Sequence, residues 1–305
     1  MIKISEVTMQ KNESDFIIIR EKAFKYFALS ASVIDESVCI FLDNEKYIKD
    51  IRPNVTMIIT TPFIGDMLTD ESYGLCLVDN PRLLFFNLHN SLANHDSYKR
   101  QQKETSIGAN CTISLMASIS NTNVTIGNNV IIEEFVVIRD NTVIGDNSII
   151  RAGTVIGGVG YEFKRTEKDI SNVKHLGGVI IGKNVEIQYN SCVDKAVYPW
   201  DDTIIGDYTK IDNLVHIAHA VKIANNVMIV ALSGIGGRTV IKENTWIGFG
   251  AIITNGIEVG HDSRANIGSV VTKSIPDYLS YSGNFAIEHN LFIRYMKKIV
   301  KESQS

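Results

Sequence analysis

An aliphatic residue recurs at every sixth position through the second half of the chain. From residue 205 onward the series is Ile205, Ile211, Ile217, Ile223, Ile229, Ile235, Ile241, Ile247, Ile253 and Val259. The fifth residue of each hexad is restricted as well: Thr209, Val215, Val221, Val227, Ser233, Thr239, Thr245, Ala251, Ile257 and Ser263. An α-helix needs apolar residues three and four apart and a flat strand needs them two apart, so this period fits neither. It favours a coiled wall of short strands.

Three such hexads would close one triangular coil of about 18 residues, and successive coils would stack at roughly 4.8 Å, the spacing of paired strands. The same frame runs backward through Val193, Ile187 and Ile181. Other phases precede it, at Ile126, Ile132, Ile138, Ile144, Ile150 and Ile156, and before those at Ile107, Ile113 and Ile119. Because each coil buries its inner face only against its neighbours, the repeat predicts a mainly β fold, a left-handed parallel β-helix.

Two stretches interrupt this prism, at residues 157–178 and 195–203. Both are too polar or irregular to continue the repeat, so we interpret them as loops that leave the coil at its corners. Long loops in a compact repeat are uncommon and are often functional, which favours an enzyme. A purely structural prism has the same fold and stays open as an alternative.

The first hundred residues lack the hexad and are predicted to form a small α/β domain, residues 1–100. Expected strands are 16–20, 37–41, 56–61 and 74–79, and expected helices lie near 44–51 and 81–93. Residues 91–106 are polar and aperiodic, as in a linker.

The β-helix is predicted over residues 104–276 and a helical tail over residues 277–305. Within the tail, residues 290–302 place apolar side chains at near-helical spacing with basic residues between them, which predicts one amphipathic helix. We expect this short helix to pack on the prism or on a neighbouring subunit rather than on a membrane.

Composition excludes several classes of protein. The net charge of −4, without a clustered basic stripe, argues against a nucleic-acid partner. The N-terminal stretch has no apolar run of signal-peptide length, and nothing reaches the roughly 18 apolar residues of a membrane span, so a cytoplasmic location is expected. The cysteines have no metal-type or disulfide-type spacing and are interpreted as packing residues: Cys39, Cys76, Cys111 and Cys192.

The densest chemistry lies at Asp212, Asn213, His216 and His219. In the hexad frame both histidines fall outside the aliphatic core. Such a histidine acts as a general base when a carboxylate holds its tautomer, and Asp212 is the nearest candidate. The other interpretation is a solvated corner with two surface histidines.

Gly237 lies 18 residues beyond His219, and is therefore expected to overlie it on the next coil. A glycine there leaves room for an acyl donor, and its amide is placed to stabilise an oxyanion. No Ser–His or Cys–His nucleophile motif is evident, so the simplest chemistry is direct acyl transfer from a thioester to an amine that the base deprotonates.

These residues resemble those of the UDP-3-O-acylglucosamine N-acyltransferase family, hexapeptide acyltransferases of lipid A synthesis. The likeness is strongest over residues 177–223. It extends to the glycine-aromatic loop GGVGYEF (157–163), to FLDNEKY (41–47), which is similar to the family's uridine-binding segment, and to NPRLLFFNL (80–88).

The resemblance implies that His219 is the base, Asp212 its supporting carboxylate and Gly237 an oxyanion donor. It further implies substrate-binding roles for five residues: Phe41 and Tyr47 on either side of the uracil, Asn44 at its edge, and Asn213 and His216. From the residues alone, Phe41 is equally a core residue and Tyr47 a helix-surface aromatic.

The resemblance also implies a homotrimer with sites between subunits, no tightly bound cofactor, and an acyl donor on the phosphopantetheine of acyl-carrier protein. Three departures concern the substrate pockets. Gly256 stands in place of a second histidine, Val159 stands where the family's loop often has an aromatic residue, and residues 193–202 replace a more regular corner. Two alternatives stay open: an N-acyltransferase for O-antigen or capsule that uses acetyl-CoA or another short acyl-CoA, and a non-catalytic trimeric scaffold.

Overall fold

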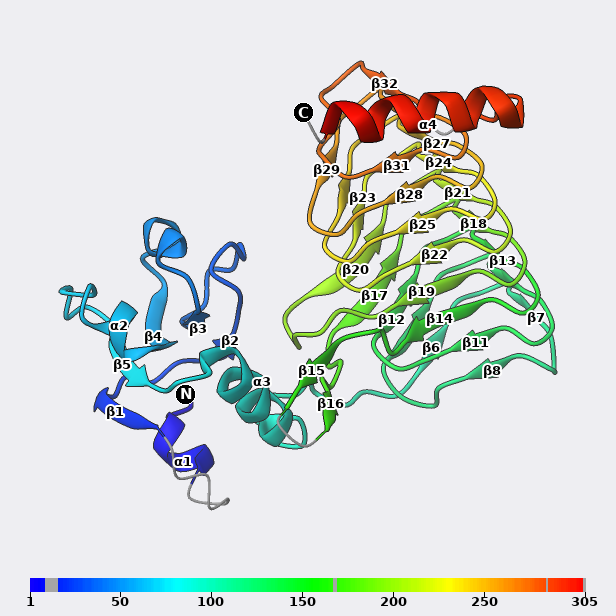
Figure 1. The fold of residues 1–305 in the computed structure, drawn as a ribbon. Coiled ribbons are helices and arrows are strands. Elements are labelled where there is room, and N and C mark those ends of the chain that lie inside the picture. The colour runs from blue at the N-terminus through cyan, green and yellow to red at the C-terminus, as the bar shows by residue number, and fades with distance from the viewer. Residues whose placement is uncertain (9–15, 167–168, 284, 304–305) are drawn as a thin grey trace.

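The structure is a computed structural model that describes residues 1–8, 16–166, 169–283 and 285–303. An N-terminal α/β domain lies beside a long β-solenoid, and a C-terminal helix lies across the far end of the solenoid (Figure 1). The fold is mainly β, as the six-residue period predicted.

The N-terminal domain is a five-stranded sheet in the order β1-β5-β4-β3-β2, parallel except for β1. Its strands are β1 Ile17–Arg20, β2 Tyr26–Phe27, β3 Val38–Leu42, β4 Val55–Thr60 and β5 Gly74–Leu77. Its helices are α1 Ile4–Thr8, the 3-10 helix η1 Glu45–Asp50, α2 Pro62–Gly65 and α3 Pro81–Leu92. The four strands and two helices expected here are present. The short elements α1, β2 and α2 were not anticipated, because two to five residues carry too little pattern.

Helix α3 follows directly from its sequence. Asn80 caps the first turn by accepting a hydrogen bond from the Leu83 N–H at 3.0 Å, and Pro81 occupies a first-turn position where no amide donor is needed. Its buried face, which includes Phe85 and Leu88, packs into the apolar cluster beside the sheet.

The segment predicted as a linker is packed onto both domains. Tyr98 is 1% exposed, and its hydroxyl lies 2.8 Å from Nδ1 of His89. Arg100 donates to the backbone oxygens of Pro199 and Asp201 and pairs with Asp202 at 2.8 Å. Tyr98 and Arg100 thus tie the segment to both domains, while residues 94–97 and 101–104 are exposed.

The solenoid has three parallel sheets, each built from one strand per coil. The first holds β7 Thr112–Ile113, β10 Ile131–Ile132, β13 Ile149–Ile150, β18 Glu186–Ile187, β21 Lys210–Ile211, β24 Met228–Ile229, β27 Trp246–Ile247, β30 Arg264–Ala265 and β32 Ser280–Tyr281. The second holds β8 Ser118–Ile119, β11 Val137–Ile138, β14 Val155–Gly158, β19 Cys192–Asp194, β22 His216–Ile217, β25 Gly234–Ile235, β28 Ile252–Ile253 and β31 Val270–Val271. The third holds β6 Ser106–Ile107, β9 Val124–Ile126, β12 Thr142–Ile144, β17 Gly178–Ile181, β20 Asp202–Ile205, β23 Lys222–Ile223, β26 Val240–Ile241 and β29 Glu258–Val259.

The predicted register is confirmed. Ile211 pairs with Ile229, and Ile217 pairs with Ile235, so residues one coil apart stack directly. The repeated aliphatic residues from Ile205 to Val259 are at most 2% exposed and form one continuous core. Many corner residues adopt the left-handed conformation, which asparagine tolerates best, as at Asn226 with φ 57°.

The two ends of the prism differ from the prediction. Ile107 belongs to the repeat but is 51% exposed, because it lies on the first strand of its sheet and has no coil beneath it. At the other end, β32 pairs with β30 and lies beyond the expected limit at residue 276.

The two interrupting loops join the domains. The first, residues 157–178, carries the hairpin of β15 Phe163–Arg165 and β16 Ile170–Asn172. From the second, Tyr198 packs in the same apolar cluster as Phe85, and Trp200 donates from Nε1 to the backbone oxygen of Phe27 at 2.9 Å. These loops therefore set the N-terminal domain against one side of the prism.

Helix α4, His289–Ser303, confirms the predicted C-terminal helix. Its apolar side chains, such as Leu291 and Tyr295, are about half exposed in the single chain (49% and 58%). Among the described residues, no helix is both long and apolar enough to cross a membrane.

Candidate active site

His219 lies at the corner after β22, outside the aliphatic core, as the hexad frame placed it. The frame did not predict its burial: His219 is only 8% exposed. The loop of residues 157–178 folds over this corner, so that Glu162 and His175 both face the imidazole. The ring centroids of His175 and His219 are 5.7 Å apart.

The two imidazole nitrogens have different surroundings. Nε2 lies 3.2 Å from Nη1 of Arg238 and 3.4 Å from Oε2 of Glu162. Nδ1 is buried and has no hydrogen-bond partner among the described residues. Nε2 is therefore the nitrogen that faces charged groups, while Nδ1 faces the loop backbone near Gly160.

Burial, together with the positive charge of Arg238, lowers the pKa of His219 to about 4. Glu162 acts in the opposite direction and raises it. At neutral pH the imidazole is thus uncharged and able to accept a proton, and Glu162 is placed to stabilise the imidazolium that would form.

Glu162 is anchored by two cations. Its carboxylate pairs with Lys164, and its Oε2 lies 3.7 Å from Nη1 of Arg238. Burial alone would raise the pKa of Glu162, but these cations hold it below its usual value. The carboxylate therefore stays ionised beside the histidine.

Gly237 lies against the face of this histidine. A Cβ atom on Gly237 would be 2.7 Å from Nε2 of His219 and 2.8 Å from its Cε1. The Gly237 N–H makes no hydrogen bond to the described part of the chain, although the neighbouring Arg238 N–H bonds the His219 carbonyl at 3.0 Å. The prediction that Gly237 overlies His219 agrees with this geometry.

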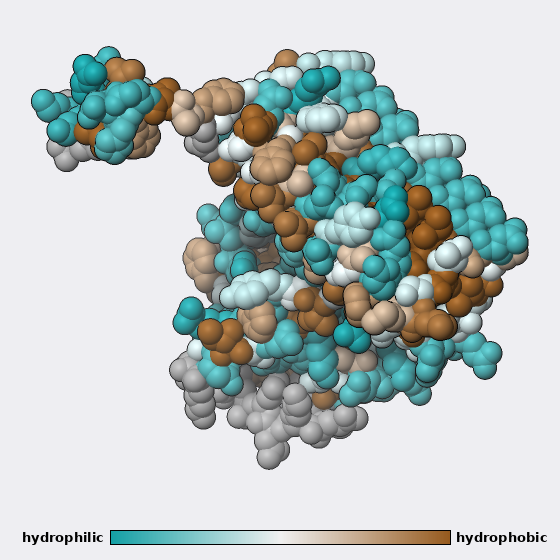
Figure 2. Space-filling model, turned by 90° about the vertical axis from the view of Figure 1, so that its right-hand side faces the viewer, coloured by the Kyte–Doolittle hydropathy of each residue, from teal (hydrophilic) through white to brown (hydrophobic). Residues whose placement is uncertain are grey.

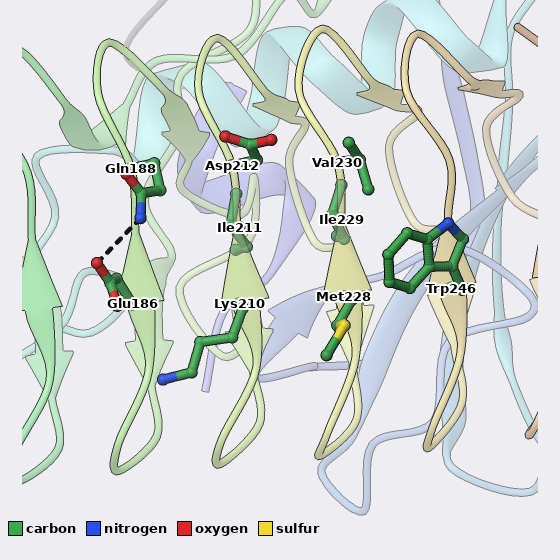
Figure 3. A pocket seen from close by; sticks show the side chains of 9 residues that line it. All are labelled: Glu186, Gln188, Lys210, Ile211, Asp212, Met228, Ile229, Val230 and Trp246. Atoms are coloured by element: carbon green, nitrogen blue, oxygen red, sulfur yellow. Dashed lines mark hydrogen bonds between the residues drawn. The ribbon is translucent and has the colours of Figure 1, made fainter. Parts of the chain in front are cut away.

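Asp212 does not contact His219 within the chain, which corrects the predicted pairing. Its Oδ1 accepts from the Asn213 N–H at 2.7 Å, and its Oδ2 accepts from the Ala231 N–H at 3.1 Å. Asp212 lines a groove of about 260 Å³ on the outside of the first sheet, together with Met228 and Trp246 (Figure 3). The carboxylate that reaches the histidine is instead that of Glu162, 3.4 Å from Nε2.

The other two residues of this stretch also lie apart from the base. His216 has a side chain 55% exposed, and its Nε2 is 3.8 Å from Oδ2 of Asp194. The Asn213 side chain accepts from the Tyr189 N–H at 3.1 Å and supports a corner of the coil. Substrate-binding roles for both remain predictions.

Two of the three uridine-binding candidates line a cleft of about 440 Å³ between the domains. Phe41 and Tyr47 contribute from the N-terminal domain, and Glu162, Lys164, Arg238 and Asn255 contribute from the solenoid side. The cleft therefore joins the predicted nucleotide site to the groups around His219. Asn44 is not among its lining residues, since its Oδ1 caps η1 by accepting from the Lys46 N–H.

The departures noted in the sequence have clear positions. Gly256 adopts φ +70° at a corner, where its N–H bonds the Gly237 carbonyl at 2.9 Å. Asn255 beside it supplies a polar side chain to the cleft. Val159 is 62% exposed at the surface of the loop.

Sequence reasoning missed Glu162, Arg238 and His175 as parts of this site. The available signals were indirect: Glu162 lies inside the GGVGYEF loop, and Arg238 directly follows Gly237. His175 comes from an aperiodic stretch that gave no signal.

Known proteins resemble this chain over limited regions, most of all over the hexapeptide repeats. The bacterial transferase hexapeptide (six repeats) family matches residues 123–158 and 202–237. A UDP-3-O-acylglucosamine N-acyltransferase of Delftia acidovorans is 32% identical over 139 residues, which are 46% of this chain and 41% of that protein. One from Caulobacter vibrioides is 44% identical over 89 residues, 29% of this chain and 26% of that protein. Residues 123–158 and 202–237 therefore carry hexapeptide repeats like those of bacterial transferases.

The matched regions cover well under two thirds of these relatives, so their whole activity does not transfer directly. Among solved structures, UDP-N-acetylglucosamine acyltransferases of Campylobacter jejuni and Bacteroides fragilis align with a TM-score of 0.53 each, at 23% and 24% identity. The alignments cover 63% and 65% of this chain and 77% and 75% of those chains. At this identity the likeness shows the fold.

Proposed function

We propose that this protein is an N-acyltransferase that moves an acyl group from a phosphopantetheine thioester to the amine of a UDP-linked amino sugar. The observation that carries the proposal is the arrangement around His219: a neutral imidazole with a glycine amide beside it, in contact with Glu162 and Arg238, which line a cleft that reaches Phe41 and Tyr47. The relatives named above supply the substrate class.

In this mechanism the amine nitrogen attacks the thioester carbonyl while Nε2 of His219 takes one of its protons. The N–H of Gly237 donates to the oxyanion that develops on the carbonyl oxygen. Collapse of the tetrahedral intermediate breaks the C–S bond and releases the thiolate, which the imidazolium proton can neutralise. The products are an amide and a free thiol, so no further reactant is needed.

Glu162 is assigned here to positioning and electrostatic support. An imidazole with a pKa near 4 is a weak base, and an ionised carboxylate 3.4 Å from Nε2 favours its protonated form. Its pairing with Lys164 keeps the carboxylate in place between turnovers.

The interdomain cleft suits a nucleotide sugar. Phe41 and Tyr47 offer aromatic faces for a uracil. The cations Arg82, Lys164 and Arg238 also line the cleft and outnumber the carboxylates Asp43 and Glu162, with which they pair. Aromatic faces at one end and a net positive lining are features expected for a nucleoside diphosphate.

We also propose a homotrimer that uses acyl-carrier protein as donor and no tightly bound cofactor. Large apolar side chains on the outer faces of the prism support an assembly of copies, among them Met228 at 47% and Trp246 at 39% exposure. Figure 2 shows hydrophobic patches between the hydrophilic rows of one side of the molecule. The cytoplasmic location and the lipid A pathway stay predictions.

The deciding experiment offers the purified protein several donors and acceptors. A 3-hydroxyacyl-carrier protein, acetyl-CoA and a short acyl-CoA are each incubated with UDP- and dTDP-linked amino sugars, and products are identified by mass spectrometry. N-acylated UDP-amino sugar from the carrier-protein donor is the expected product. Product from acetyl-CoA alone would favour the O-antigen or capsule alternative.

The variant His219→Ala distinguishes the proposed enzyme from a non-catalytic scaffold. The variant is expected to lose turnover by roughly two to four orders of magnitude, the usual contribution of a general base. If the wild type forms no product with any donor and acceptor pair, the non-catalytic scaffold becomes the better interpretation.

A further inference from the structure

Three side chains that take no part in the proposed proton transfer meet on the outside of the second sheet. Cys192 on β19 pairs in register with His216 on β22, so their side chains project from neighbouring strands. Asp194 follows two residues after Cys192 on the same face. Sγ of Cys192 lies 3.6 Å from Oδ1 of Asp194, and Nε2 of His216 lies 3.8 Å from Oδ2 of that carboxylate.

These separations are close to those of ligands that share one metal ion. The three donor atoms all lie within 4.8 Å of one another. Around a tetrahedral zinc ion, bonds of about 2.3 Å to sulfur and about 2.0 to 2.2 Å to nitrogen or oxygen place neighbouring donors about 3.4 to 3.6 Å apart. The two contacts to Asp194 are near that range, each to a different carboxylate oxygen, so a small rotation of the side chains would bring the three donors around one ion.

No Lys or Arg of the described residues neutralises the buried Asp194 carboxylate. Its side chain is 6% exposed, and among the described residues no Lys or Arg forms an ion pair with it. The adjacent cation, Lys195, pairs instead with Asp140 at 2.9 Å. A buried carboxylate without a cation is costly, so a positive charge between Asp194, Cys192 and His216 would stabilise the corner.

We propose that Cys192, Asp194 and His216 form a binding site for a zinc-class divalent cation. A thiolate and an imidazole select this class over magnesium or calcium, which prefer oxygen ligands throughout. Three protein ligands complete a site that keeps a fourth position for water or a small ligand. The half-exposed His216 supplies the path from solvent.

The site adjoins the proposed base, and His216 is the one ligand that also has a predicted substrate-binding role. Both sites border Gly160: a Cβ atom there would lie 3.1 Å from Oδ2 of Asp194 and 3.2 Å from Nδ1 of His219. The cation would therefore lie close to the base, on the Nδ1 side of its ring. Binding is a property of the protein that does not depend on the acyl-transfer assignment.

Cobalt(II) provides the test, because it takes the place of zinc and reports its ligands by colour. The full-length protein, without an affinity tag, is stripped of metal under reducing conditions and titrated with Co²⁺. We expect one cobalt per chain, with d–d bands of a tetrahedral ion and a thiolate charge-transfer band in the near ultraviolet, both removed by Zn²⁺.

Variants identify the ligands. Cys192→Ser should abolish the charge-transfer band, and His216→Gln should weaken Co²⁺ binding at least about 10-fold, since even loss of an outer-shell partner costs 10- to 100-fold. Cys111→Ser is the matched control: Cys111 is also a partly exposed thiol of the prism, and its variant should behave as wild type.

Two results would overturn the site. One is a charge-transfer band that persists in Cys192→Ser or disappears in Cys111→Ser. The other is the absence of any cobalt spectrum with Co²⁺ in excess, which would leave Asp194 and His216 as a plain carboxylate–imidazole pair. Circular dichroism on each variant establishes that the prism is intact, so loss of binding is not mistaken for unfolding.

Discussion

Replacing Gly237 by alanine tests the geometry of the site with a single methyl group. The new Cβ would lie 2.7 Å from Nε2 of His219, whereas ordinary contacts begin at 3.4 Å, so the ring must retreat by roughly 0.7 Å. Any retreat disturbs the contacts that hold the ring, to Glu162 at 3.4 Å from Nε2 and to the His175 ring at 5.7 Å between centroids. The imidazole therefore has to tilt away from its working position.

A displacement of about 1 Å in a reacting group costs about 100-fold in rate. For roughly 0.7 Å we expect kcat to fall about 30- to 100-fold, or about 2 to 3 kcal/mol in the activation barrier. The methyl group should also cost about 1 to 3 kcal/mol of stability through overpacking. The N–H of residue 237 is retained, so the loss reports the position of the base rather than removal of an oxyanion donor.

The assay is steady-state product formation with the best donor and acceptor pair, together with urea unfolding. Gly234→Ala is the matched control, since its Cβ would meet only the flexible end of Ile252 at 3.2 Å and should leave kcat within about twofold. A Gly237→Ala enzyme that is folded and turns over at the wild-type rate would refute the proposed placement of His219 beside Gly237.

Four further predictions follow from the same contacts. Glu162→Gln removes a charge that raises the pKa of His219, so the acid limb of the kcat/KM profile should move to lower pH and kcat should fall; a move to higher pH would contradict this role. Phe41→Ala should mainly raise the KM for the nucleotide sugar, and an unchanged KM would place the uridine site elsewhere. Asp212→Asn should leave kcat within about twofold at a stability cost of about 0.5 to 1.5 kcal/mol, because Asp212 bonds backbone amides and does not contact the base; a large loss of kcat would restore it as a catalytic support. Burial lowers the pKa values of both His89 and His219 from 6.5 to about 4. As pH falls from about 6.5 to 4 the unfolded chain therefore binds protons at these histidines before the folded chain does, and the free energy of unfolding should decline by at most about 3 kcal/mol per histidine. Urea unfolding at pH 7 and pH 5 measures this decline, and equal stabilities would refute it.

The solenoid could be predicted because its determinants are local and repeated. Each hexad supplies one long aliphatic residue to the same interior, and the 18-residue coil fixes which residues stack, as Ile217 and Ile235 do. The same count places Gly237 next to His219, as the structure has it. Short elements such as β2 were missed because a pair of residues carries no period.

The predicted partner of His219 failed for a physical reason. Asp212 is near in sequence, but a corner of the prism turns its side chain to a different outer face (Figure 3). Glu162 is 57 positions away in the chain (219 minus 162) and reaches the imidazole only because the loop of residues 157–178 folds over the second sheet. Sequence proximity was a poor guide to which carboxylate is close.

The amino-acid sequence by itself determined the prism, its register and the stacking of His219 under Gly237, because a short period repeated many times leaves a single way to bury the aliphatic residues. The tertiary structure alone decided that His219 is buried, that Glu162 and Arg238 flank it, that Phe41 lies on the same cleft, and that Cys192 meets His216. These contacts join segments that share no period, and they depend on how two loops and one domain dock on the prism, so no local pattern in the chain encodes them.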